Sequence, residues 1–173
     1  MAFSIGDKVM HPRFGAGQIT GEEHRELVKG FEHYYVIKML AARSTAYVPI
    51  GQMDELGVRL VMSWAKLVQV MGILRSVPSA LSNDHSERQA EVQEQLGSRL
   101  PILVAQVVRD LSWRRKRKRL TQKDQAFLKH GRELLANEMA LATDGDVMKA
   151  HEMIDGTLRT AWASEFGELE TVF

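Results

Sequence analysis

One stretch, residues 104–119 (VAQVVRDLSWRRKRKR), places the strongest constraint on how this chain can fold. Its first half puts Val104, Val107, Val108 and Leu111 at helical spacing, which creates an apolar face that must be covered. Its second half is a run of six basic residues that has to stay at the surface: Arg114, Arg115, Lys116, Arg117, Lys118 and Arg119. The sequence therefore predicts a helix with a buried root and a cationic end.

The charge of this stretch is concentrated rather than typical of the chain. Its seven basic residues and one acid give a local charge of +6, whereas the whole chain carries +1. Such a concentration favours binding to an anionic polymer, because each neutralised phosphate releases condensed counterions. The alternative is a solvated helix end, with its cations near the negative pole of the helix dipole.

The first third of the chain has a different pattern, with short β-like segments between glycine-rich turns. We expect five strands, at residues 8–10, 16–27, 33–40, 45–50 and 58–62. Five short strands in about sixty residues predict a small, strongly bent antiparallel barrel. Residues 1–62 carry seven basic and seven acidic side chains, so this part has no net charge.

The remaining two thirds predict a compact bundle of about five helices. We expect helices from Ser63 to Arg75, from His85 to Leu96, from Pro101 through the basic run, from Thr121 to Leu141 and from Thr143 to Trp162. The first should bury Leu67, Val68, Met71 and Leu74, and Gly97 should end the second. Trp64 and Trp162 are expected in the core, and Trp113 in the core or at a helix cap. The predicted fold is therefore α+β, with a domain at residues 1–62 and another at 63–173.

Several classes of function find no support in the sequence. The chain has no cysteine, and its six histidines lack the HExxH metal spacing. No phosphate-binding glycine loop and no nucleophile elbow is present. We therefore expect no enzyme and no cofactor. We also expect a cytoplasmic monomer without a membrane association, since no apolar run is long enough to span a bilayer.

Three groups of residues together resemble a known family. The first third of the chain resembles the amino-terminal domain of the CarD/CdnL family of bacterial transcription regulators. The residues that carry this resemblance are Gly6-Asp7-Lys8-Val9, then Pro12 with Phe14-Gly15-Ala16-Gly17, and residues 43–49 (RSTAYVP). The same RNA-polymerase-interacting module occurs in the transcription-repair coupling factor. Residues 107–111 (VVRDL) and 113–115 (WRR) resemble the helical domain of the family.

The resemblance implies a Tudor-like barrel that binds the β subunit of RNA polymerase. The positions that match the contacts of the family are Arg25, Leu27, Arg43, Tyr47 and Pro49. Some relatives have a basic residue at position 47, so Tyr47 would contact by stacking or hydrogen bonding. The alternatives are an ordinary cross-strand pair for Tyr47 and a surface salt bridge with Glu22 or Glu23 for Arg25.

The resemblance also implies that the helical domain contacts promoter DNA at the upstream edge of the transcription bubble. Family members insert a tryptophan there, but the corresponding window, residues 80–85, contains none. Leu81 could act as a smaller wedge, or it could simply pack in its loop. The predicted DNA contacts are Leu81, Asn83, Arg88 and the six basic residues Arg114–Arg119.

The resulting hypothesis is a transcription regulator that modulates open-complex formation or stability. One alternative is an adaptor that binds polymerase through its barrel and another protein through its helices. A stand-alone RNA-binding barrel is a further alternative, which the zero net charge of residues 1–62 disfavours.

Overall fold

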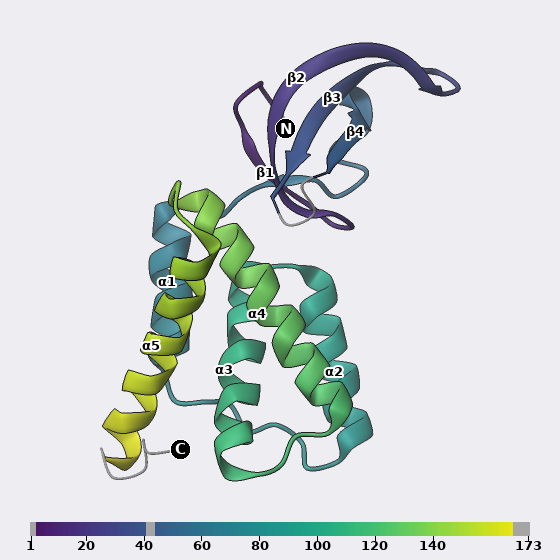
Figure 1. Ribbon diagram of the computed structural model, residues 1–173. Helices are drawn as coiled ribbons and strands as arrows, with labels where there is room; N and C mark the ends of the chain where they lie inside the picture. The colour runs from purple at the N-terminus through teal and green to yellow at the C-terminus, as the bar shows by residue number, and fades with distance from the viewer. Residues whose placement is uncertain (1–2, 41–43, 168–173) are drawn as a thin grey trace.

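The computed structural model describes residues 3–40 and 44–167, and it consists of a sheet followed by a helical bundle (Figure 1). The strands are β1 (Lys8–His11), β2 (Gly15–Val28), β3 (Phe31–Met39), β4 (Thr45–Pro49) and β5 (Arg59–Leu60). The helices are α1 (Trp64–Arg75), α2 (His85–Ser98), α3 (Pro101–Arg117), α4 (Gln122–Ala142) and α5 (Val147–Phe166). The predicted α+β fold, with five strands before five helices, is confirmed in the described residues.

The sheet is antiparallel throughout and has the strand order β4-β3-β2-β1-β5. Within the described ranges, β4 and β5 do not pair with each other, so they remain the two edges of the sheet. The sheet is therefore curled but open, and the predicted barrel holds only in a loose sense. A short 3-10 turn (Ile50–Gln52) leads away from β4.

One glycine allows the middle of the sheet to pack tightly. Gly17 lies between Val9 on β1 and Met39 on β3. A Cβ atom at this position would lie 2.9 Å from both Ile37 Cγ2 and the backbone oxygen of Lys38. Because a backbone oxygen cannot rotate away, only glycine fits here. The core of the sheet, on Val9, Ile19, Ile37, Val48 and Met53, closes around this point.

Side-chain caps start four of the helices. Oxygens of Ser63, Asp84, Thr121 and Asp146 accept hydrogen bonds from backbone N–H groups in the first turns of α1, α2, α4 and α5. Helix α3 begins with Pro101 instead, as the sequence predicts. The predicted role of Gly97 is wrong, because α2 continues past it and Arg99 takes the left-handed conformation, with φ of 52°.

Two predictions about the core of α1 are also wrong. Trp64 is 71% exposed and Val68 is 56% exposed, whereas Val70 is fully buried. Trp64 is the first residue of its helix, so it precedes the turn that packs on α3 and α5. Trp113 and Trp162 are buried as predicted, and their ring centroids lie 5.1 Å apart.

A buried ion pair joins the sheet to the bundle. Arg59 on β5 donates two hydrogen bonds to the Glu138 carboxylate on α4, at 2.6 and 3.0 Å, and one to the carbonyl of Arg99 at 2.6 Å. The backbone N–H of Met62 donates to the same carboxylate at 2.8 Å. Lys8 on β1 adds an ion pair with Asp144 at 2.6 Å. These contacts fix the sheet against the upper end of α4 (Figure 1).

No helix in the described part of the chain combines the length and the apolar character that a bilayer crossing requires.

Candidate functional surfaces

The far end of β2 contains an irregular segment that carries two of the predicted polymerase contacts. His24 pairs with His33 and Val28 pairs with Phe31, so residues 25–27 on β2 face one residue on β3. Such a bulge turns side chains out of the regular alternation of the strand. The backbone N–H of Val28 donates to the hydroxyl of the buried Tyr34 at 2.9 Å, which fixes the end of the bulge.

The bulge brings Arg25 over the ring of Tyr47 on β4. The guanidinium carbon lies 4.5 Å from the ring centroid, which is the geometry of a cation–π contact. Arg25 also forms an ion pair with Glu23, and this hydrogen bond raises the pKa of Arg25 above its ordinary value. The structure thus contains the salt bridge that the sequence left as an alternative, and it pairs the two side chains that were predicted as separate contacts.

The other three predicted polymerase contacts have different placements. Leu27 is 52% exposed and lies in the bulge beside Arg25. Pro49 is buried opposite Tyr34, which disfavours its predicted contact with a partner. Arg43 lies outside the described residues. The candidates that remain accessible are therefore the exposed Arg25 and Leu27 and the half-buried Tyr47.

The basic run lies at the end of the bundle that is remote from the sheet (Figure 1). Arg114 is half-buried, and the five residues from Arg115 to Arg119 are exposed. None of the described acids forms an ion pair with any of the six. Lys116 and Arg117 lie instead over the rings of Trp162 and Phe166, at 5.9 and 4.9 Å. This surface, residues 115–119, is called the basic end below.

The α1–α2 loop is held beside the basic end by a buried polar cluster. Arg109 pairs with Asp110 at 2.6 Å, and its guanidinium donates to the hydroxyls of Ser76 and Ser79 at 2.7 and 2.9 Å. Asp110 accepts from the backbone N–H of Ser79 at 3.1 Å. Arg109 therefore adds no surface charge, and the positive charge of the stretch comes from the six residues that follow Trp113.

Leu81 lies in this loop and is half-buried against the helical core. A shallow groove of about 190 Å³ lies between the loop and the basic end, and Leu81, Trp113, Arg117 and Lys118 line it. The exposed Asn83 accepts a hydrogen bond from the ammonium of Lys118 at 3.1 Å. The structure thus favours the packing role for Leu81 over the wedge, although it brings the window 80–85 and the basic run together on one surface.

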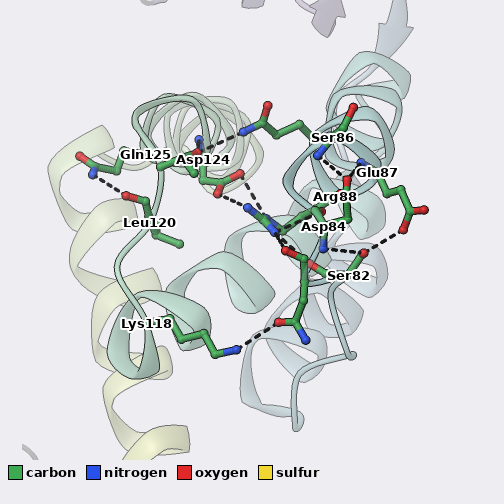
Figure 2. A network of polar contacts seen from close by, with 12 residues as sticks. Ser82, Asp84, Ser86, Glu87, Arg88, Lys118, Leu120, Asp124 and Gln125 are labelled. Atoms are coloured by element: carbon green, nitrogen blue, oxygen red, sulfur yellow. Dashed lines mark hydrogen bonds and ion pairs between the residues drawn. The ribbon is translucent and has the colours of Figure 1, made fainter.

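Arg88 is buried, which disfavours its predicted contact with DNA. Its side chain is 3% exposed and forms an ion pair with Asp124 on α4 at 2.8 Å. The same guanidinium donates to the carbonyls of Ser82, Asn83 and Asp84, at 2.9, 3.3 and 3.3 Å. Figure 2 shows Arg88 enclosed between this loop and the start of α4. Arg88 therefore fixes the loop instead of binding a phosphate.

The partner of Arg88 is a carboxylate with no exposed surface. Burial opposes the ionisation of Asp124, but hydrogen bonds from Arg88 and Thr121 outweigh it, so the pKa of Asp124 lies below its ordinary value. The pair is therefore charged at neutral pH. A signal for it exists in the sequence, because Arg88 lies four and eight residues before Val92 and Leu96, on the apolar face of α2.

Three metal-binding side chains lie close together on the sheet, which the sequence spacing does not suggest. His24, Glu32 and His33 place their ligand atoms within 4.8 Å of one another at the end of β2 and β3. All three are exposed, and His24 forms an ion pair with Glu32 at 3.5 Å. The cross-strand register, rather than the HExxH spacing, is the signal that finds them. Proximity on an open surface does not by itself define a metal site.

The two parts of the chain match the two domains of a class of transcription factors that interact with RNA polymerase. Residues 3–62 match the CarD-like/TRCF RID domain, and residues 69–155 match the CarD C-terminal domain. The chain therefore belongs to the CarD family. It is also similar to the "Putative transcription factor YdeB" of Bacillus subtilis (strain 168), with 28% identity over 137 residues that cover 79% of this chain and 90% of that protein.

Proposed function

We propose that the sheet binds the β subunit of RNA polymerase, that the helical part binds promoter DNA, and that the two contacts together modulate formation or stability of the open complex. The observation that carries the proposal is the basic end. It is an exposed cationic surface without acidic partners in the described residues, on the opposite end of the bundle from the sheet (Figure 1). One molecule can therefore contact polymerase and DNA at the same time.

Two features of the sheet support a protein partner there. Strand β4 is an open edge, so its outward backbone groups can pair with a strand of another chain. Tyr47 on this edge and Arg25 above its ring offer an aromatic and a charged anchor, and Leu27 adds an exposed apolar side chain. Arginine and tyrosine are frequent anchors in protein interfaces.

The polymerase contact is tested by pull-down of the β subunit with the wild type, Arg25→Glu and Tyr47→Ala. We expect recovery to fall about tenfold with either variant, because both remove an anchor at the β4 edge. The control is Arg13→Glu, which makes the same charge change in the turn before β2, at the other end of that strand. Equal recovery with Arg25→Glu and the wild type would remove Arg25 from the contact, and no recovery with any of them would remove the proposed partner.

The DNA contact is tested by the salt dependence of binding to a promoter duplex. The double variant Arg117→Glu/Arg119→Glu should lower the slope of log affinity against log salt by about 2, because each lost phosphate contact contributes about 0.9. The control, Lys29→Glu/Lys149→Glu, makes the same charge change at two exposed lysines outside the basic end. The lifetime of the polymerase open complex, measured with the same variants, connects DNA binding to transcription.

The adaptor alternative has one observation of its own. Trp64 and Val68 are one helical turn apart on α1, and both are mostly exposed, which is typical of a surface that binds a protein. An unchanged salt slope in the basic-end variant, together with normal recovery of the β subunit, would favour this adaptor and contradict DNA binding.

A further inference from the structure

A cavity lies beside the basic end, inside the bundle, and the proposed function makes no use of it. It has a volume of about 370 Å³ and lies between the last turns of α3, the middle of α4 and the second half of α5. Ser112, Trp113 and Trp162 form its inner wall, and Arg115, Lys116 and Arg159 surround its opening. A volume in this range is typical of sites for small ligands.

The inner wall offers hydrogen-bond donors that have no acceptor. The Nε1 atoms of Trp113 and Trp162 and the hydroxyl of Ser112 are buried and have no hydrogen-bond partner. The residues themselves are 3%, 6% and 7% exposed. An indole N–H can only donate, and leaving such a donor buried without a partner costs about 1–3 kcal/mol. These three atoms themselves have almost no accessible surface, so a ligand in the cavity could reach them only after the side chains turn.

The opening is positively charged, and among the described residues no unpaired acid lines it. Within the described ranges Asp155 is the one carboxylate that lines the cavity, and Arg132 engages both of its oxygens in a bidentate ion pair. The remaining cations are Arg115, Lys116 and Arg159, none of which forms an ion pair with a described acid. Guanidinium groups and ammonium groups also only donate. Every unpaired polar group at the cavity, apart from the hydroxyl, is thus a donor, and the net charge favours an anion.

We propose that this cavity binds a phosphorylated small molecule of up to nucleotide size. A phosphate group supplies several acceptor oxygens and a negative charge, and arginine matches its geometry well. The two indole rings lie on α3 and α5 with their centroids 5.1 Å apart, and both residues line the cavity. The volume exceeds that of a single phosphate, which leaves room for a second phosphate or a nucleoside.

The cavity shares Arg115 and Lys116 with the basic end, but other residues distinguish the two sites. Trp162 and Arg159 belong to α5 and are not part of the basic end, whereas Arg117 and Arg119 do not line the cavity. A backbone phosphate of DNA offers the same chemistry, so the experiment includes a DNA arm. If the cavity binds no phosphorylated molecule, the predicted salt slope for the basic end is unaffected. If the salt slope is unchanged in the basic-end variant, the prediction of ligand binding in the cavity is likewise unaffected.

The experiment uses the full chain with Trp64→Phe, which removes the exposed tryptophan and leaves the two at the cavity as reporters. Inorganic pyrophosphate and ATP are titrated by calorimetry and by tryptophan emission. We expect a Kd below about 1 mM for at least one of them, with a change in emission. Arg159→Glu should weaken binding about tenfold or more, because it replaces a cation that lines the cavity with an anion.

The control is Lys149→Glu, which makes the same charge change ten residues earlier on α5, about 15 Å along the helix. It should change the Kd less than about twofold. Three results would overturn the proposal. They are the absence of binding of both probes up to about 10 mM, an equal loss with Lys149→Glu, and displacement of pyrophosphate by a promoter duplex, which would assign the cavity to DNA.

Discussion

Neutralising Glu138 should loosen the connection between the sheet and the bundle. In Glu138→Gln the carbonyl oxygen of the new side chain can still accept from the backbone N–H of Met62, which now donates to the carboxylate at 2.8 Å. The amide NH₂ of the glutamine then faces the guanidinium of Arg59, so two donors meet where a bidentate ion pair existed. The variant therefore removes one interaction and preserves another.

The size of the expected loss in the free energy of unfolding depends on how deeply Arg59 and Glu138 are buried. Breaking a buried ion pair by removing one partner costs about 3–5 kcal/mol. Glu138 is 3% exposed, but Arg59 is 28% exposed and can recover part of its hydration. We therefore expect a loss of about 2–3 kcal/mol in the free energy of unfolding. With a urea slope of about 2 kcal/mol/M, the midpoint should fall by about 1 M.

Urea unfolding, followed by tryptophan emission and by far-ultraviolet circular dichroism, measures this loss. All three tryptophans lie in the bundle, so their emission follows that part of the chain, whereas dichroism also includes the sheet. Coincident transitions in the wild type and separated transitions in Glu138→Gln would show that the pair couples the two parts. Glu133→Gln, at an exposed position on the same helix, is the matched control and should change stability by less than about 0.5 kcal/mol.

A double variant tests whether Arg59 and Glu138 stabilise the protein by interacting with each other. Arg59→Met alone leaves the Glu138 carboxylate buried without its cation, which should be worse than Glu138→Gln. Adding Glu138→Gln to Arg59→Met should then restore stability, because it removes the buried charge. Strict additivity of the two single changes would show that the two side chains do not interact and would contradict the argument.

Three further predictions concern stability. Arg88→Met should cost about 3–5 kcal/mol in urea unfolding, since it leaves Asp124 charged and buried, and it should not change the DNA salt slope of the folded protein. The folded pKa of Asp124 is lowered, so its contribution to stability is complete above the ordinary value of about 3.9 and is lost as the pH falls through the folded value. Asp124→Asn should remove that pH dependence, which urea midpoints at pH 5 and pH 3 would detect. Gly17→Ala should cost about 1–3 kcal/mol by overpacking, whereas Gly21→Ala, where a Cβ meets nothing within 4 Å, should cost less in the same assay.

Local chemistry made most of the fold predictable from the sequence. Turn residues such as Gly15, with φ of +84°, and cap residues such as Ser63 and Thr121 act over a few positions, so their effects are visible in short windows. The strands and the first four helices begin within about two residues of the predicted positions for the same reason, whereas α5 begins at Val147 instead of Thr143 because Asp146 caps it. Gly97 failed as a terminator because α2 uses the left-handed Arg99 instead.

The candidate site was less predictable, because burial depends on partners that are distant in sequence. Arg88 meets Asp124 across 36 positions, and Arg59 meets Glu138 across 79. A local window places Arg88 on the apolar face of α2 but does not identify its partner, and it shows Arg59 as an ordinary surface cation. The contact between Arg25 and Tyr47 likewise depends on a bulge whose register no window reveals. Trp64 shows the opposite error, since its apolar side chain suggested a core position that the helix start does not provide.

The position of Leu81 changes what the basic end can contribute under the proposed function. Contacts to phosphates bind DNA without reading its sequence, and the half-buried Leu81 supplies no exposed wedge for a base step. Selection of promoters over other DNA then has to come from polymerase, which the sheet would bind and which would hold the basic end at a high effective concentration near the template. The rigid junction at Arg59 and Glu138 fixes the direction in which that end points. A loosened junction should therefore weaken the effect on the open complex, while the affinity for DNA in the absence of polymerase stays unchanged. If the protein acted only by binding phosphates, without its connection to polymerase, the two quantities would not differ in this way.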